Sequence, residues 1–127
     1  MSAFATPEAA HKLVARRVNQ LYERFKINLT YYLENMPEDD EVGSKYAKKN
    51  ALAVVNQFKK DLVSIQKGMQ GNYQFLEIQR LEIVIIACQG PSYRWIDLFK
   101  RDDYIKNLKN TDKKIAQAIR KNFSDIT

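Results

Sequence analysis

The sequence predicts an all-α protein: a helical bundle with two long antiparallel helices, a buried third helix and short C-terminal helices. Apolar residues recur at steps of three and four through two long stretches, which is the period of an amphipathic helix. Glycine and proline are scarce, with four and three residues respectively. Apolar residues make up 45% and charged residues 28% of the 127-residue chain. We therefore expect residues 1–127 to form a single helical domain.

The first predicted helix begins at Thr6, with Pro7 at its first position and Glu8 in its first turn. Threonine is a favourable N-cap, proline is tolerated at the first helical position, and an acid there faces the positive end of the helix dipole. Seven apolar residues then share one face for six turns: Val14, Val18, Leu21, Phe25, Leu29, Tyr32 and Met36. This face is expected to pack in the core.

The run from Pro37 to Gly43 interrupts this period with four acids and predicts a loop. Ser44 then offers an N-cap for a second long helix. Its core-facing apolar residues follow one another at the same three- and four-residue steps as those of the first helix: Ala47, Ala51, Val54, Phe58, Leu62, Ile65 and Met69. Gly68 and the pair Gly71 and Asn72 are expected to end this helix, which would form an antiparallel hairpin with the first.

Residues 75–88 are apolar nearly all round in their second half, and they are compatible with a helix or a strand. The β-branched run from Leu81 to Ile86 would suit a buried strand, but the rest of the chain offers no partner strand. We therefore favour a central buried helix, ended by Gly90 and Pro91. Cys88 lies in this run and is predicted to be a core side chain rather than a nucleophile.

The remaining residues predict shorter helices that open near Ser92, Asp102 and Thr111, each a plausible N-cap. The last of these helices is amphipathic, with Ile115, Ala116, Ile119 and Phe123 on its apolar face.

The residue types argue against catalysis, a cofactor and a metal. One histidine and one cysteine cannot form a zinc site by themselves. His11 is expected to be solvated, and the glycines at 68 and 71 lack the spacing and the lysine of a phosphate loop. If an ion site exists, the acidic run is its most plausible place: Glu38, Asp39, Asp40 and Glu41. We otherwise interpret these acids as a solvated loop.

A single cysteine excludes an intramolecular disulfide and is typical of a reducing compartment. The first residues lack the basic flank and apolar run of a signal peptide, and the longest apolar run, Ile83 to Cys88, is too short to span a bilayer. We expect a cytoplasmic protein without a membrane partner.

Positive charge is concentrated on two predicted helices. The second helix carries six lysines and only Asp61, and four of the lysines fall on a stripe away from its core face: Lys45, Lys49, Lys60 and Lys67. The last helix repeats the arrangement with Lys113, Lys114, Arg120 and Lys121. Solvated helix faces usually alternate positively and negatively charged side chains. Faces that carry lysines and few acids therefore favour the binding of a polyanion such as nucleic acid or nucleotide. Tyr93, Arg94 and Trp95 could add a stacking platform, although Trp95 also fits a core-facing stripe.

The alternative is a protein-interaction module, such as an adaptor, assembly factor or inhibitor that binds an acidic protein surface. Leu13, Ile27 and Tyr31 form a second apolar stripe on the first helix, roughly opposite the first. Either this helix lies centrally within its own bundle, or the stripe is exposed as a partner or homo-oligomer interface.

The stretch from Arg16 to Arg24 resembles the start of the LYR family of small basic mitochondrial helical proteins. In that family an arginine follows Leu-Tyr directly, whereas Glu23 follows Leu21 and Tyr22 here and Arg24 comes one position later. Members act as assembly factors or accessory subunits that bind an acyl carrier protein. The resemblance therefore implies a protein partner near Leu21, Tyr22 and Arg24.

Overall fold

The computed structural model describes residues 6–38, 42–69 and 75–124. These residues form five helices: α1 (Pro7–Glu34), α2 (Val42–Lys67), α3 (Phe75–Ala87), α4 (Arg94–Leu98) and α5 (Arg101–Phe123). No strand occurs in these ranges, so the helical interpretation of residues 75–88 is confirmed.

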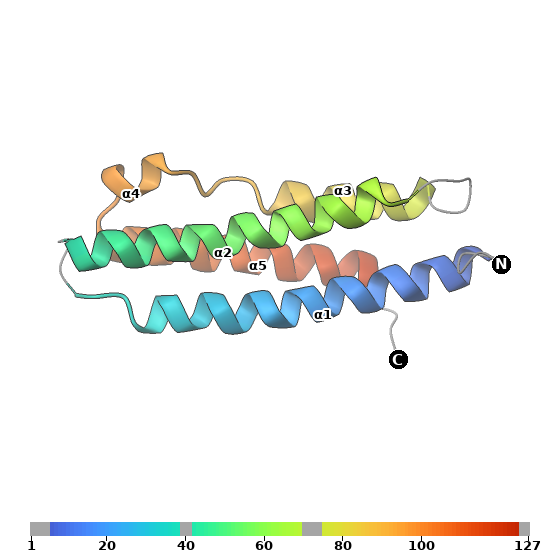
Figure 1. The fold of residues 1–127 in the computed structure, drawn as a ribbon, viewed down its shortest axis with the longest axis horizontal. Helices are drawn as coiled ribbons and strands as arrows, with labels where there is room; N and C mark the ends of the chain where they lie inside the picture. The colour runs from blue at the N-terminus through green and yellow to red at the C-terminus, as the bar shows by residue number, and fades with distance from the viewer. Residues whose placement is uncertain (1–5, 39–41, 70–74, 125–127) are drawn as a thin grey trace.

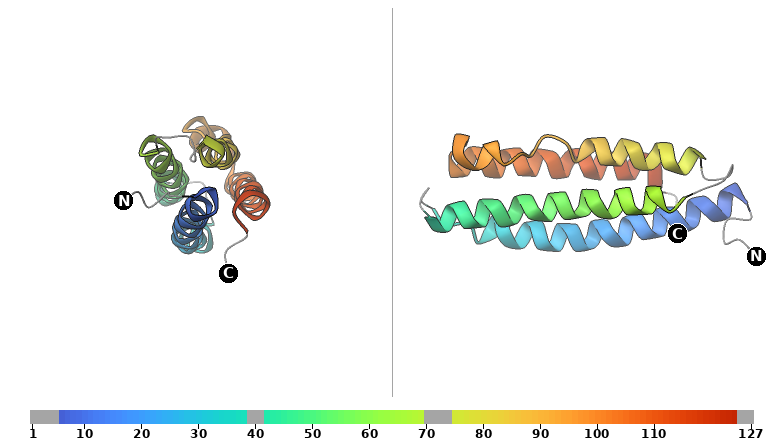
Figure 2. Two further views of the ribbon diagram at one scale, coloured as in Figure 1. Left: turned by 90° about the vertical axis from the view of Figure 1, so that its right-hand side faces the viewer. Right: turned by 45° about the horizontal axis from the view of Figure 1, so that its top comes forward.

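The helices form an up-down-up-down bundle in which α1 and α2 are the two long antiparallel helices predicted from the sequence (Figure 1). α3 and α4 together occupy the third position, with α3 beside the C-terminal half of α2 and α4 beside its N-terminal half. Seen along its axis, the bundle places α2 and α5 at opposite corners, and α1 and α3 at the other two (Figure 2). The outer sides of α2 and α5 therefore face in opposite directions.

The start and core face of α1 are confirmed. The Thr6 hydroxyl accepts a hydrogen bond from the Ala9 amide at 3.1 Å, and Pro7 occupies the first helical position. Val14, Val18, Phe25, Leu29 and Met36 are buried, because their common face points into the bundle. Phe25 stacks on Phe58 of α2, with ring centroids 4.8 Å apart.

The N-cap predicted at Ser44 is wrong, because α2 already begins at Val42. Ser44 lies in its first turn with helical backbone, and its hydroxyl is buried without a hydrogen-bond partner in the described chain. Gly68 follows the end of α2 as expected, whereas Gly71 and Asn72 lie outside the described residues.

α3 is less buried than we expected. Its inner face packs against α2 and α5 through Leu81, Val84 and Ile85. Ile83 and Ile86 point outward and are 48% and 52% exposed, and Phe75 and Leu76 are also exposed. A four-cornered bundle covers only the inner side of each helix, so none of the described helices packs against the apolar outer side of α3.

The expectation of short C-terminal helices is correct for α4 alone. α5 is a single helix of 23 residues, and the helix start predicted at Thr111 does not exist. Thr111 is buried within α5, where its hydroxyl donates to the Asn107 carbonyl at 3.0 Å. A threonine bonded in this way satisfies its hydroxyl inside a helix and needs no helix end. Asp102 and Asp103 lie in the first turn of α5, where they face the positive end of its dipole.

Cys88 is a core residue, as predicted. It is buried, and its thiol donates to the Val84 carbonyl at 3.4 Å. Burial raises the pKa of the thiol to about 12, although the positive charge of Lys59 acts in the opposite direction. A thiol held in its neutral form in this way is a poor nucleophile.

Candidate functional site

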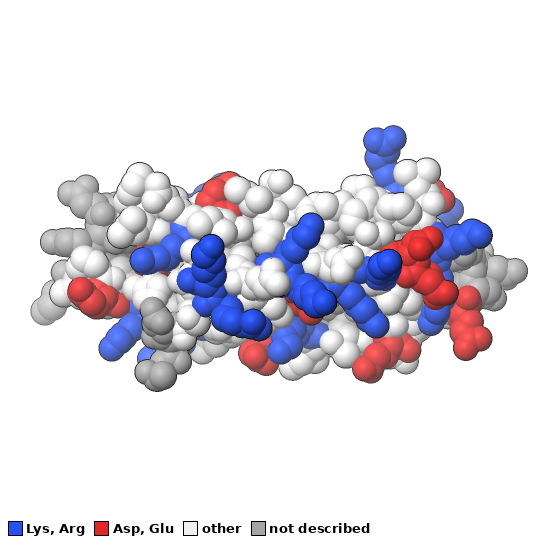
Figure 3. Space-filling view, turned by 180° about the vertical axis from the view of Figure 1, so that it is seen from behind, with Lys and Arg blue, Asp and Glu red and all other residues white. Residues whose placement is uncertain are grey.

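The outer face of α5 is a continuous basic surface. The four predicted residues Lys113, Lys114, Arg120 and Lys121 are all exposed on it, opposite the buried Ile115, Ile119 and Phe123. Figure 3 views the bundle from the α5 side, where Lys and Arg side chains run along the middle of the face and Asp and Glu lie mainly toward its edges.

Two further lysines extend this surface. Lys106 and Lys109 are exposed on the same side of α5. The sequence interpretation omitted them because it ended one helix and began another at Thr111, which separated them from the later lysines. The "α5 basic face" is defined here as Lys106, Lys109, Lys113, Lys114, Arg120 and Lys121. At roughly 1.5 Å per residue, it extends about 22 Å along the helix.

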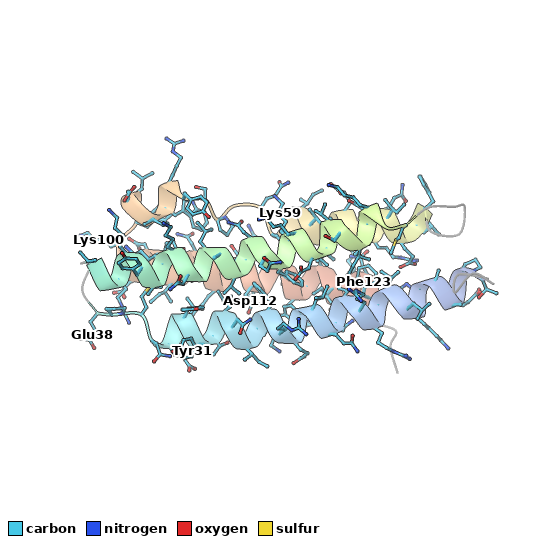
Figure 4. All side chains as sticks on the ribbon, in the orientation of Figure 1. Tyr31, Glu38, Lys59, Lys100, Asp112 and Phe123 are labelled. Atoms are coloured by element: carbon cyan, nitrogen blue, oxygen red, sulfur yellow. The ribbon has the colours of Figure 1, made fainter. Side chains whose placement is uncertain are left out.

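Acids on α5 do not neutralise this face. Asp102 and Asp103 are confined to the first turn, and Asp102 accepts a hydrogen bond from Arg101 at 2.7 Å. Asp112 is the only acid between residues 106 and 121, and it accepts a hydrogen bond from the Tyr22 hydroxyl of α1 at 3.0 Å. Asp112 therefore points into the α1–α5 contact (labelled in Figure 4) rather than out among the lysines.

The lysine stripe predicted on α2 is exposed but lies on the opposite side of the bundle. Lys45, Lys49, Lys60 and Lys67 all reach solvent. Lys45 forms an ion pair with Asp97 of α4 at 3.1 Å, so part of its charge is compensated. Because α2 and α5 occupy opposite corners, the structure does not combine the two predicted basic faces into one surface (Figure 2).

Lys48 is buried beside this stripe and has a structural contact that the sequence pattern did not indicate. Its ammonium donates to the Phe99 carbonyl at 2.8 Å, while its own carbonyl accepts a hydrogen bond from the Tyr104 hydroxyl at 2.6 Å. These contacts attach the turn between α4 and α5 to α2. Desolvation is the main cause that raises the pKa of the Tyr104 hydroxyl.

His11 is not the solvated residue that we expected. Its Nδ1 lies 3.1 Å from Oε1 of Glu77, a carboxylate that is only 2% exposed, and its ring stacks on Phe123. Glu77 also forms an ion pair with Arg80 one turn later on α3. This cluster joins α1, α3 and the end of α5. The sequence pattern missed it because the contact depends on residues 66 positions apart.

The second apolar stripe of α1 is exposed. Ile27 and Tyr31 are 68% and 60% exposed, whereas Leu13 is 42% exposed and lines a hollow together with Ser64 and Ile65 of α2. Of the residues in the LYR-like stretch, Tyr22 packs against Phe25 and Phe58 and bonds to Asp112. Its hydroxyl therefore faces the bundle rather than a partner.

Within the described ranges, no group of three or more His, Cys, Asp or Glu side chains is placed to hold a metal ion. Asp39, Asp40 and Glu41 of the acidic run lie outside those ranges, and Glu38 is exposed. None of the described helices is both long and apolar enough to cross a membrane.

Comparisons with known protein families, with characterised proteins and with solved structures gave no match to this chain.

Proposed function

We propose that this chain is a non-enzymatic binding protein that engages nucleic acid through the α5 basic face. The observation that carries the proposal is the alignment of six exposed cations on one side of one helix, from Lys106 to Lys121. Phosphates attract such a surface, and their neutralisation releases condensed counterions. We place this activity in the cytoplasm, where the single thiol stays reduced.

The proposal predicts a steep dependence on salt. Six phosphate contacts on duplex DNA correspond to a slope of about −5 in a plot of log affinity against log salt concentration. Affinity should then fall about 10³-fold between roughly 50 and 200 mM salt. A much shallower slope would mean that few of the six side chains contact phosphate.

The direct test compares two variants with the same change in net charge. The first reverses Lys113, Lys114, Arg120 and Lys121 to Glu on α5. The control reverses four exposed cations on the α1 and α2 side of the bundle: Arg17, Arg24, Lys60 and Lys67. Binding to labelled duplex DNA and single-stranded RNA is measured by fluorescence anisotropy at both salt concentrations, and helicity by circular dichroism.

We expect the α5 variant to lose nearly all binding and the control to lose much less. Equal losses would show a response to net charge alone, without a defined surface. Unchanged binding in a folded α5 variant would refute the proposal.

A second candidate function is a protein-interaction module, which the exposed apolar surface favours. Ile83 and Ile86 on α3, and Ile27 and Tyr31 on α1, are all exposed. Burying such side chains against a second copy of the chain would stabilise a homo-oligomer. Light scattering tests this form directly, since a monomer at high concentration excludes self-association. An acidic protein partner would instead contact the α5 basic face and compete with nucleic acid for it.

A further inference from the structure

A groove lies between the N-terminal half of α2 and α4. Figure 1 shows these two helices at one end of the bundle, with α5 behind α2. The groove consists of two adjoining hollows of about 460 and 610 Å³. The two hollows share four lining residues: Val42, Lys45, Ile96 and Asp97. Each volume lies within the range of about 300–1,000 Å³ that is typical of small-molecule sites.

Two exposed tyrosines line the smaller hollow. Tyr46 comes from α2 and Tyr93 immediately precedes α4, and they are 66% and 58% exposed. Among the described side chains, neither ring stacks on another aromatic ring, and more than half of each side chain is accessible to a ligand. Large aromatic rings exposed in a hollow are typical stacking platforms for nucleobases, because every base presents a π-face.

Cations line the same groove. Lys45 and Lys49 line the smaller hollow, and Lys100, labelled in Figure 4, lines the larger one. Among the described residues that line the groove, Asp97 is the single acid, and its ion pair with Lys45 joins the two walls. Both partners of that pair are more than 60% exposed. Breaking an exposed ion pair costs about 1 kcal/mol or less, so an incoming phosphate can replace Asp97 as the ion-pair partner of Lys45.

We propose that this groove binds one nucleotide unit of a single-stranded nucleic acid. The base stacks on Tyr46 or Tyr93, and Lys45 and Lys49 bind the adjoining phosphate. Asp97, released from Lys45, accepts a hydrogen bond from a base amino group or a ribose hydroxyl. This inference rests on the proposed nucleic-acid function and adds a second contact surface, in which aromatic stacking distinguishes single strands from duplexes.

The chain contains its own reporter for this test. Trp95 is the only tryptophan, lies on α4 beside the groove, and packs against Phe99 with ring centroids 5.1 Å apart. We expect its fluorescence to change when an eight-nucleotide single-stranded RNA is titrated into the full-length protein. The probes for comparison are adenosine monophosphate, inorganic phosphate and a polyglutamate peptide.

The principal variant replaces both groove tyrosines, Tyr46→Leu with Tyr93→Leu. Its control is Phe75→Leu, which removes a similarly exposed aromatic ring, 61% exposed, at the start of α3 and away from the groove. Loss of one stacked base costs about 1–3 kcal/mol, which corresponds to about 5- to 150-fold in affinity. We expect a loss of at least 10-fold for the RNA in the double variant and no loss in the control. Lys49→Glu, which leaves both rings in place, should weaken binding as well.

Several outcomes would overturn the inference. Equal affinities for the double variant, the control and the unaltered protein would show that the tyrosines contact no base. Polyglutamate binding as tight as RNA binding would assign the groove to an acidic peptide. Adenosine monophosphate that binds as tightly as the RNA would assign it to free nucleotides rather than to a strand.

The groove and the α5 basic face can fail separately. If the α5 reversals leave RNA affinity unchanged while the tyrosine variant loses it, the groove stands and the α5 proposal fails. If only the α5 reversals reduce binding, the α5 proposal stands and the groove inference is refuted.

Discussion

Arg80→Met should destabilise the protein more than the double variant Arg80→Met with Glu77→Leu. Glu77 is 2% exposed and lies on the inner side of α3, where its carboxylate contacts Arg80 and His11. Removing the guanidinium alone leaves a buried negative charge with one fewer cationic partner. Removing both charged groups leaves an apolar side chain on the inner side of α3 beside the His11 ring, with no buried carboxylate left to compensate, and such replacements are often well tolerated.

The magnitude follows from the exposure of the partners. Breaking a fully buried ion pair by removing one partner costs about 3–5 kcal/mol. Arg80 is 35% exposed, and His11 remains within 3.1 and 3.2 Å of the two carboxylate oxygens of Glu77. We therefore expect Arg80→Met to cost less than that range, about 2–3 kcal/mol. For a domain of this size that corresponds to a fall in Tm of about 10 °C. The double variant should recover at least about 1 kcal/mol of this loss.

Urea denaturation followed by circular dichroism at 222 nm measures these differences, and Glu77→Leu alone completes the double-mutant cycle. Methionine keeps most of the aliphatic stem of arginine, so the comparison isolates the charge. If the double variant is as unstable as Arg80→Met, or less stable, the buried carboxylate is not the cause and the reasoning fails.

Three further predictions concern single side chains. Cys88 should react with a thiol reagent at pH 8 only after unfolding. Burial raises the pKa of this thiol from an ordinary value of about 9 to about 12, so the thiol of the unfolded chain ionises first as the pH rises. The free energy of unfolding should therefore fall between about pH 9 and 12, and it should fall less in Cys88→Ala. An equal fall in both proteins would exclude this cause. Tyr104→Phe removes the 2.6 Å hydrogen bond to the Lys48 carbonyl and should cost about 1–2 kcal/mol in urea denaturation, whereas no loss would mean that water replaces it. Gly90 has φ of 124°, and the nearest atom to an added Cβ is 3.9 Å away, so an alanine there would meet no clash. Gly90→Ala should therefore lower the free energy of unfolding by about 1–2 kcal/mol through backbone strain alone. An unchanged Tm would contradict this.

Local patterns were sufficient to predict much of the fold. The cap at Thr6 and the core face of α1 depend on neighbours three and four residues apart, which the sequence displays directly. The burial of Cys88 and the exposure of Lys113 and Lys121 follow from the same period. Where a local motif was ambiguous, the prediction failed: Ser44 and Thr111 have the residue type of an N-cap, yet both lie inside helices.

The tertiary structure decided what the helices place next to one another. It sets α2 and α5 at opposite corners and thereby separates two basic faces that look equivalent in sequence. It leaves Ile83 and Ile86 exposed on α3, and it brings Glu77 against His11. Helix period determines which side of a helix is apolar, but the packing of distant segments determines what lies opposite that side. For that reason the sequence alone indicated Lys113, Lys114 and Lys121 of α5, whereas the groove between α2 and α4 became visible only in the folded chain.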